Sequence, residues 1–322
     1  MTPISTSKLN APSTSIPVFY LNMDRRVDRR AAVMQVLSEL RLSHVQRVPA
    51  LDGLALWHNK TLGLACGSAV APKALEGISL TRPVLGIRMT AGAAGLLSTT
   101  RELLLSLSLS AAPGCNHSTG PNAALVLDDD VRLAPATSPR EVRRMLRVAA
   151  TAAASADCER HTSAVTRGKA ENGRAAGSTS TALWGQWDIL ALGYHGGFRG
   201  QPADLHPSFG YNVSLSGQLS NVVRPVRQRA EDGHLFGSFA YIVRMSSAAK
   251  LVDAVFPSEL QLDSAYARAN RQHRIRMLAL SRPLFVSVPS RPGDTDIQQL
   301  PTRLVMTPRE ARPPSLRRLP AR

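Results

Sequence analysis

The sequence predicts an α/β fold, a Rossmann-type mixed sheet flanked by helices. Residues 16–53 pass from a short apolar run through a polar turn and a helical pattern to a second apolar run. This order opens a doubly wound α/β unit. The apolar run 123–127 then stops at three adjacent aspartates, and ligands of such sheets bind at the carboxyl ends of the strands. With 43% apolar residues among 322, the chain can bury a full core.

The first half of the chain supplies the opening elements. Residues 1–15 are rich in Ser, Thr and Pro and are expected to form a disordered tail. Strands are expected at Val18–Leu21 and Val45–Ala50, with a turn at Leu51-Asp52-Gly53 after the second. The helix between these strands has its apolar face at Val33, Val36, Leu37 and Leu40.

The middle of the chain adds two helices around the acidic strand. A helix is expected over 91–110, with Leu96, Leu97, Leu103, Leu104 and Leu107 as core candidates. Ser98 is expected near the start of this helix. A second, Ala-rich helix is expected over 140–154. Residues 155–182 are polar, small and low in complexity, which predicts a mobile insertion.

The last third completes one domain that spans about 16–300. Strands are expected at 188–192 and 239–243, and a helix at 246–255. Residues 301–322 form a Pro/Arg-rich tail that cannot bury a core.

The acidic cluster Asp128, Asp129 and Asp130 is the most informative feature. Three adjacent carboxylates repel one another, and burying an unpaired one costs several kcal/mol. A hard divalent cation with a phosphate-bearing ligand in its coordination shell would neutralise them. The alternative is a solvated acidic turn at the end of an ordinary strand.

Four arginines (Arg25, Arg26, Arg29 and Arg30) stand where the first strand passes into its helix. Helix N-termini attract anions, and guanidinium groups bind phosphate oxygens through two hydrogen bonds. Together with the acidic cluster, these arginines predict a binding site for a diphosphate with its metal ion. The alternative is a solvated basic face in a chain that is Arg-rich throughout.

Several segments together resemble glycosyltransferase family 25, the lipooligosaccharide and procollagen galactosyltransferases. Residues 19–30, FYLNMDRRVDRR, resemble its opening motif, Ala50-Leu51-Asp52-Gly53 its "A-x-D-G" turn, and 128–131 its acidic motif. Further matches occur in order at 187–193, 237–251, Asp263 and 292–297. One departure is Thr99, which replaces a family histidine in the stretch 91–99.

The resemblance implies a GT-A-like enzyme that transfers a hexose, galactose first, from a UDP-sugar to a glycan or protein hydroxyl. A Mn²⁺ or Mg²⁺ ion would neutralise the diphosphate leaving group, with Asp128 and Asp130 as ligands and Asp129 on the ribose or a water. Nucleotide-sugar contacts are also expected from Asn22, Asp24, Arg25, Arg29 and His234.

An inverting transferase also needs a carboxylate base for the attacking hydroxyl. Asp263 is the first candidate and Asp188 the second. Asp263 is equally well explained as the N-cap of a helix over 264–270. For Asp188, which follows Trp187 at a strand start, a structural role is favoured.

Composition leaves two alternatives to an active transferase. One is a catalytically lapsed relative that binds a nucleotide or a glycan, indicated by Thr99. The other is a nucleic-acid-associated protein, which the net charge of +16 invites; however, the basic residues are spread out, aromatic residues are 5%, and no nucleic-acid partner is expected. The three cysteines lack metal-site spacing. Without a signal peptide or membrane span, the cytoplasm is the default location, although the family would allow the lumen of the endoplasmic reticulum or Golgi.

Overall fold

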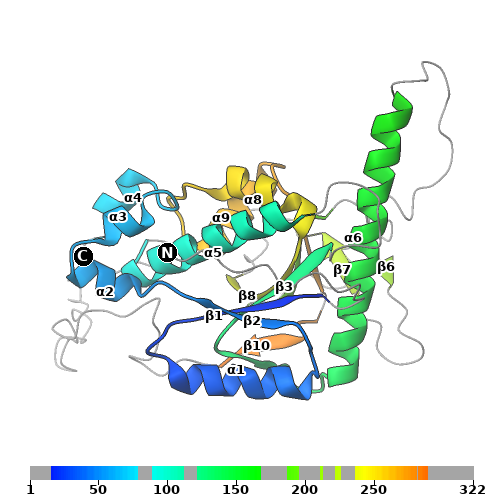
Figure 1. The fold of residues 1–322 in the computed structure, drawn as a ribbon, viewed down its shortest axis with the longest axis horizontal. Helices are drawn as coiled ribbons and strands as arrows, with labels where there is room; N and C mark the ends of the chain where they lie inside the picture. Colours follow the sequence, from blue (N-terminus) through cyan, green and yellow to red (C-terminus); the bar gives the residue numbers. More distant parts are fainter. Residues whose placement is uncertain are drawn as a thin grey trace, which may run out of the picture.

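The computed structural model describes residues 16–78, 89–111, 122–167, 187–195, 211–212, 222–225, 236–280 and 282–288. They form a mixed parallel and antiparallel sheet flanked by helices, so the predicted α/β class is confirmed (Figure 1). The predicted tails 1–15 and 301–322 lie outside the described residues, as does His234.

Among the described residues, the sheet has ten strands in the order β2-β1-β3-β8-β5-β9-β7-β6, with β10 paired to β4 and β5. The strands are β1 (Val18–Asn22), β2 (Val45–Pro49), β3 (Ala123–Asp128), β4 (Val131–Leu133), β5 (Ile189–His195), β6 (Tyr211–Asn212), β7 (Val222–Pro225), β8 (Phe236–Arg244), β9 (Met277–Leu280) and β10 (Phe285–Ser287).

Strand direction defines two edges of this sheet. β1 runs parallel to β2 and β3, whereas β8 runs antiparallel to both β3 and β5. The carboxyl ends of β1, β3 and β5 therefore meet the amino end of β8 along one edge, which we call the carboxyl edge. The opposite edge is the amino edge.

Helices cover both faces of the sheet. They are α1 (Val27–Glu39), α2 (Gly53–His58), α3 (Leu62–Cys66), α4 (Pro72–Glu76), α5 (Ala91–Ser110), α6 (Pro139–Arg167), α8 (Ala248–Val255) and α9 (Leu262–Arg271), with a 3₁₀ turn η3 (Met245–Ser247). α5, α8 and α9 lie on one face and α1 on the other, while α6 projects beyond the rest of the fold (Figure 1).

Alternation along the strands divides the core between the two faces. Phe19 and Leu21 of β1 pack with α5, whereas Val18 and Tyr20 pack with α1 and α6. This is the period of two that a doubly covered sheet requires. Residues on the α5 face of β1 and β3 therefore point toward the same helix at the carboxyl edge.

Helix α5 occupies the predicted range, but the predicted place of Ser98 is wrong. The N-cap is Thr90, whose hydroxyl accepts a hydrogen bond from the Ala93 amide at 3.1 Å, and Ser98 lies inside the helix. The helix predicted over 140–154 continues as α6 to Arg167, into the predicted insertion 155–182. Polar sequence hid this continuation because it shows no apolar face.

Candidate active site

The pocket at the carboxyl edge is formed by the ends of β1 and β3. Leu21 pairs with Asp128 in parallel register, and the chain turns at Asp129 and Asp130 before β4 begins. A cavity of about 80 Å³ opens between these strand ends, the loop 50–53 and the first turns of α5. All three aspartates line it, together with Arg29.

Asp128 faces α5, because its register partner Leu21 belongs to the core on that side. Burial raises the pKa of Asp128 well above its usual range, and the charges of Asp130 and Asp129 raise it further. Arg29 opposes this shift without removing it. The ionised form of Asp128 therefore lacks adequate compensation within the described protein.

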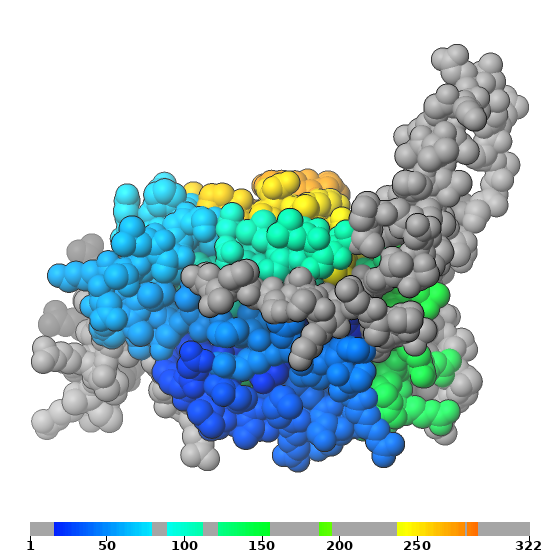
Figure 2. Space-filling model, viewed as in Figure 1, coloured from blue at the N-terminus to red at the C-terminus, as the bar shows by residue number. Residues whose placement is uncertain are grey.

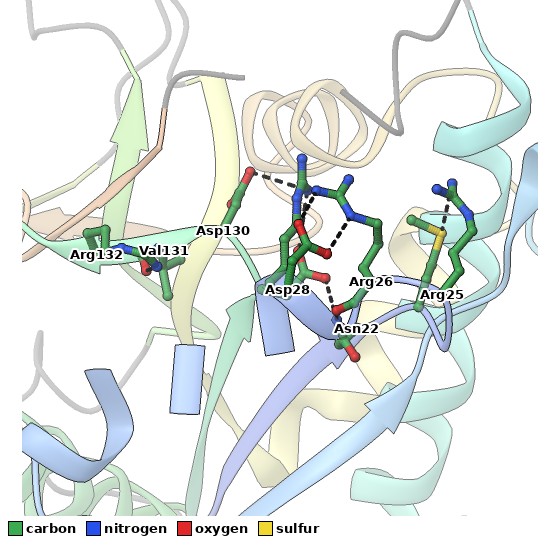
Figure 3. A network of polar contacts seen from close by, with 10 residues as sticks. Asn22, Arg25, Arg26, Asp28, Asp130, Val131 and Arg132 are labelled. Atoms are coloured by element: carbon green, nitrogen blue, oxygen red, sulfur yellow. Dashed lines mark hydrogen bonds and ion pairs between the residues drawn. The ribbon is translucent and has the colours of Figure 1, made fainter. Parts of the chain in front are cut away.

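Asp129 is buried on the other side of the turn. The Asn22 amide donates to its carboxylate at 2.7 Å, and the Arg29 guanidinium donates to the second oxygen at 3.4 Å. Figure 3 shows Asn22 among the polar residues near Arg26, Asp28 and Asp130. Burial raises the pKa of Asp129, whereas Asn22 and Arg29 lower it. These bonds fix the orientation of its carboxylate.

Asp130 carries a carboxylate that is only partly satisfied. Arg29 lies 3.8 Å from its Oδ2, while Oδ1 is buried without a hydrogen-bond partner among the described residues. Burial raises the pKa of Asp130 to about 6, against the effect of Arg29. A buried acceptor of this kind calls for a cation or a donor that the described side chains do not supply.

Asn22 takes a different part from the one predicted. Its amide nitrogen donates to Asp129 and to the Arg26 carbonyl, and its oxygen accepts hydrogen bonds from Arg30 and Arg47, each at 3.0 Å. Two donors and two acceptor positions are the whole capacity of the side chain. Asn22 is thus saturated by the protein, and we correct its expected nucleotide contact to the positioning of Asp129.

Asp24 and Arg25 also differ from the prediction of direct nucleotide contacts. The Asp24 side chain is 85% exposed and pairs with Arg47, and Arg25 pairs with Asp52. Neither of the two lines the pocket, whereas Arg29 and Asp52 do. Hydrogen bonding to Arg47 lowers the pKa of Asp24. Their pairing therefore holds the loops around the pocket together.

The wall opposite the aspartates depends on two glycines that let α5 approach the loop 50–53. A Cβ at Gly53 would lie 1.7 Å from the Ala91 carbonyl oxygen, and a Cβ at Gly95 would lie 2.4 Å from the Leu51 oxygen. No side chain fits at either distance. On the face shown in Figure 2, the segment around α2 to α4 accordingly lies directly against α5.

Thr99, which replaces the family histidine, belongs to this same contact. Its hydroxyl accepts a hydrogen bond from the Leu51 amide at 2.9 Å and donates to the Gly95 carbonyl at 2.8 Å. Its side chain is buried and does not line the pocket. Thr99 thus fixes the loop that forms the pocket wall.

Asp263 lies at the same carboxyl edge, beside the acidic strand. Its carboxylate accepts hydrogen bonds from the amides of Gly237, at the start of β8, and of Ser264. It lines a second cavity of about 20 Å³ with Gly237 and Ser238. The expected N-cap role is wrong, because α9 begins at Leu262 and Gln261 holds the cap position.

Asp188 lies at the amino edge, opposite the acidic cluster. Its carboxylate pairs with Lys250 at 2.6 Å and accepts a hydrogen bond from the Arg276 amide at 2.7 Å. The side chain is 2% exposed. The second candidate base is therefore wrong, and Asp188 joins β5 to α8 and β9.

The acidic cluster does not form a ready-made metal cage. Within the described ranges, no three His, Cys, Asp or Glu side chains are grouped so as to hold an ion. Asp129 is committed to Asn22 and Arg29, which leaves Asp128 and Asp130 as the oxygen ligands at the pocket. Two carboxylates with substrate phosphates and water are the usual protein share of a Mg²⁺ site.

Sequence reasoning missed Asp52 and Gly92 as pocket residues. Asp52 caps α2, since its carboxylate accepts a hydrogen bond from the Ala55 amide at 3.1 Å. Gly92 stands in the first turn of a twenty-residue helix, and a glycine inside a helix is itself a signal of a close approach.

Comparison with known proteins adds no assignment. No protein-family model and no curated protein matches the chain. The resemblance to glycosyltransferase family 25 therefore stays a prediction. Among the described residues, no helix combines the length and apolar character needed to cross a bilayer.

Proposed function

We propose that this protein is a metal-dependent glycosyltransferase. It moves a hexose, with galactose as the first candidate, from a UDP-sugar to a hydroxyl of a glycan or protein. One observation carries the proposal: buried carboxylates with raised pKa values gather at the carboxyl edge and line a pocket with Arg29. Such clusters of perturbed carboxylates mark functional sites.

The donor set fits a hard divalent cation. Asp128 and Asp130 line the pocket and offer oxygen ligands, and the buried Oδ1 of Asp130 has no hydrogen-bond partner among the described residues. Bound there, Mn²⁺ or Mg²⁺ would act as a Lewis acid on the diphosphate leaving group. Arg29 lies at the same wall, and its guanidinium is the group best placed to contact a phosphate oxygen.

The pocket is large enough to hold part of a UDP-sugar but not the whole molecule. Its volume of about 80 Å³ holds two or three waters, each about 30 Å³ in the liquid. Sites that enclose a whole drug-sized ligand measure about 300–1,000 Å³. We therefore propose that the cation and the phosphate oxygens bound to it occupy this pocket, beside Gly92 in the first turn of α5, where helix amides favour anions, and that the rest of the donor lies outside it.

Asp263 is the candidate for the base that accepts the proton of the attacking hydroxyl. It shares the carboxyl edge with Asp128 but lines a separate cavity. The two amides that donate to its carboxylate fix its orientation at this edge. A general base must be held within reach of the proton that it accepts.

The test measures UDP binding by calorimetry with Mn²⁺ and with a chelator, followed by turnover of a UDP-sugar panel. We expect Asp130→Asn to weaken Mn²⁺ and UDP binding together. Asp28→Asn is the matched control, because Asp28 pairs with Arg26 and its side chain is 68% exposed. UDP affinity that is unchanged in chelator would contradict the metal bridge.

The same assays separate the alternatives. Metal-dependent UDP binding without turnover of any UDP-sugar would identify a lapsed relative. Thr99 favours neither outcome, because its hydroxyl holds the Leu51 amide and does not line the pocket. Absence of both binding and turnover would refute the proposal.

A further inference from the structure

A pair of tyrosines lies beneath Asp128 on the α5 face of the sheet. Tyr241 of β8 pairs with Val126 of β3, so its ring shares a face with Val126 and, two residues on, Asp128. Tyr266 of α9 meets Tyr241 edge to face, with ring centroids 5.9 Å apart and planes at 71°. Both side chains are buried.

The hydroxyls of Tyr241, Tyr266 and Thr100 lie close together, with the Tyr241 hydroxyl between the other two, but none forms a hydrogen bond of normal geometry with a described residue. Within the described part of the chain, Tyr241, Tyr266 and the neighbouring Thr100 each bury a hydroxyl oxygen that makes no hydrogen bond. Leaving a buried polar group unpaired costs about 1–3 kcal/mol. Phenylalanine would fill the same space without this cost. Three such hydroxyls together indicate that they serve a polar group nearby.

Two carboxylates stand near these hydroxyls: Asp128, two residues beyond the register partner of Tyr241 on the same face, and Asp263, which lines a cavity with both rings. The negative charge of Asp128 adds to burial in raising the pKa of both tyrosines. The Asp263 carboxylate already accepts hydrogen bonds from the amides of Gly237 and Ser264. Asp129 is oriented by Asn22 and Arg29. By contrast, no hydrogen bond reaches the Asp128 carboxylate from the described residues.

We propose that Tyr241 and Tyr266 are positioning residues that orient the Asp128 carboxylate through their hydroxyls when a divalent cation and the donor diphosphate occupy the pocket. A hydroxyl that donates to one carboxylate oxygen leaves the other oxygen for the cation. Ligating carboxylates are commonly fixed in this way, and loss of such a partner typically weakens metal binding by about 10–100-fold. The inference rests on the proposed function, since it needs the cation at Asp128.

The experiment compares Tyr241→Phe, Tyr266→Phe and the double variant with the unaltered protein. Calorimetry measures Mn²⁺ affinity in the presence of UDP, and thermal unfolding in chelator measures Tm. We expect the double variant, and at least one single variant, to bind Mn²⁺ about 10–100-fold more weakly. Their Tm in chelator should be unchanged or higher, because each substitution removes an unpaired buried hydroxyl.

Tyr194→Phe is the matched control. Tyr194 is also a buried tyrosine, but its hydroxyl donates to the Leu280 carbonyl at 2.6 Å. Removing that bond should lower Tm and leave Mn²⁺ affinity unchanged, the reverse of the pattern expected for the tyrosine pair. A structural role for Tyr241 and Tyr266 would give the Tyr194 pattern instead.

The outcomes are separable from those of the proposed function. If the unaltered protein does not bind Mn²⁺ with UDP, the proposed function fails. If it binds, but the double variant binds equally well, the proposed function stands and the positioning role is wrong. A lower Tm with unchanged Mn²⁺ affinity would likewise overturn the positioning role.

Discussion

The acidic cluster should make the metal-free protein less stable at neutral pH, and Asp130→Asn should relieve this. Burial raises the pKa of Asp130 from 3.8 to about 6. A group whose pKa is higher in the folded state favours folding below its unfolded pKa, and this benefit disappears as the pH rises through the folded value. At pH 7 the ionised, buried carboxylate therefore opposes folding.

The magnitude follows from the shift of the pKa. One pKa unit corresponds to about 1.4 kcal/mol, so a shift from 3.8 to about 6 amounts to at most about 3 kcal/mol at pH 7. At pH 5 the same group is largely protonated in the folded state, and the difference falls to roughly half of that value. The side chain is 23% exposed, so solvent reduces both figures.

The assay is urea unfolding in chelator at pH 5 and pH 7. We expect Asp130→Asn to unfold at higher urea than the unaltered protein at pH 7, with a smaller gain at pH 5 and an unchanged slope. Mn²⁺ with UDP should stabilise only the unaltered protein. Equal midpoints at pH 7, or a gain that grows toward pH 5, would refute the reasoning.

Asp28→Asn supplies a control of opposite sign. Hydrogen bonding to Arg26 lowers the pKa of Asp28 to about 2, despite some desolvation. A lowered pKa stabilises the fold above the unfolded value, and this stability is lost as the pH falls through the folded value. The variant should therefore be slightly less stable at pH 7, by a small amount because the side chain is largely exposed.

Three further predictions concern the base and the pocket wall. Asp263→Asn should keep UDP affinity and lower turnover by about 10²–10⁴-fold, and normal turnover would exclude it as the base. Thr99→Val should lower the free energy of unfolding by about 1–2 kcal/mol, because the Leu51 amide loses its acceptor; Thr99→Ser, which keeps the hydroxyl, should restore it, and equal denaturation midpoints would contradict this. Gly53→Ala should destabilise by about 2 kcal/mol or more through backbone overlap, whereas Gly63→Ala, with nothing within 4 Å, should be neutral or stabilising; equal effects on urea unfolding would overturn the close approach.

Strand ends could be predicted from the sequence because the pattern is local. The apolar run before Asp128 and the apolar run before Asn22 each mark a buried strand, and polar residues after them fall at the carboxyl edge. The choice between Asp188 and Asp263 could not be made this way. The choice depends on β8 running antiparallel between β3 and β5. This pairing joins segments far apart in the chain, so no local sequence pattern predicts it.

Hydrogen-bond saturation was equally hidden from the sequence. Asn22 stands in a polar motif after a strand, as a ligand-binding residue would, yet four contacts within the protein use its full capacity. Thr99 is the converse case. A missing histidine predicts lost function, whereas the threonine hydroxyl holds the Leu51 amide. Partners distant in sequence decide both cases, so only the folded chain identifies them.

The carboxylates of this protein fall into two classes, and the contrast bears on why the acidic cluster exists. Asp24, Asp28 and Asp52 each pair with an arginine, and each has a lowered pKa. These pairs favour the ionised form and hold the loops near the pocket.

The aspartates of the cluster behave in the opposite way, with raised pKa values in spite of Arg29. Asp130 has an unpaired oxygen at the pocket, and the hydroxyl of Tyr241 is buried on the sheet face that Asp128 shares. Natural sequences satisfy buried polar groups elsewhere and leave such conflicts at functional sites. A bound cation with its phosphate ligand would neutralise the carboxylates of the cluster. The tyrosine hydroxyls could then donate to a carboxylate held in one orientation. The buried carboxylates with raised pKa values at the carboxyl edge thus favour a binding site over an acidic turn.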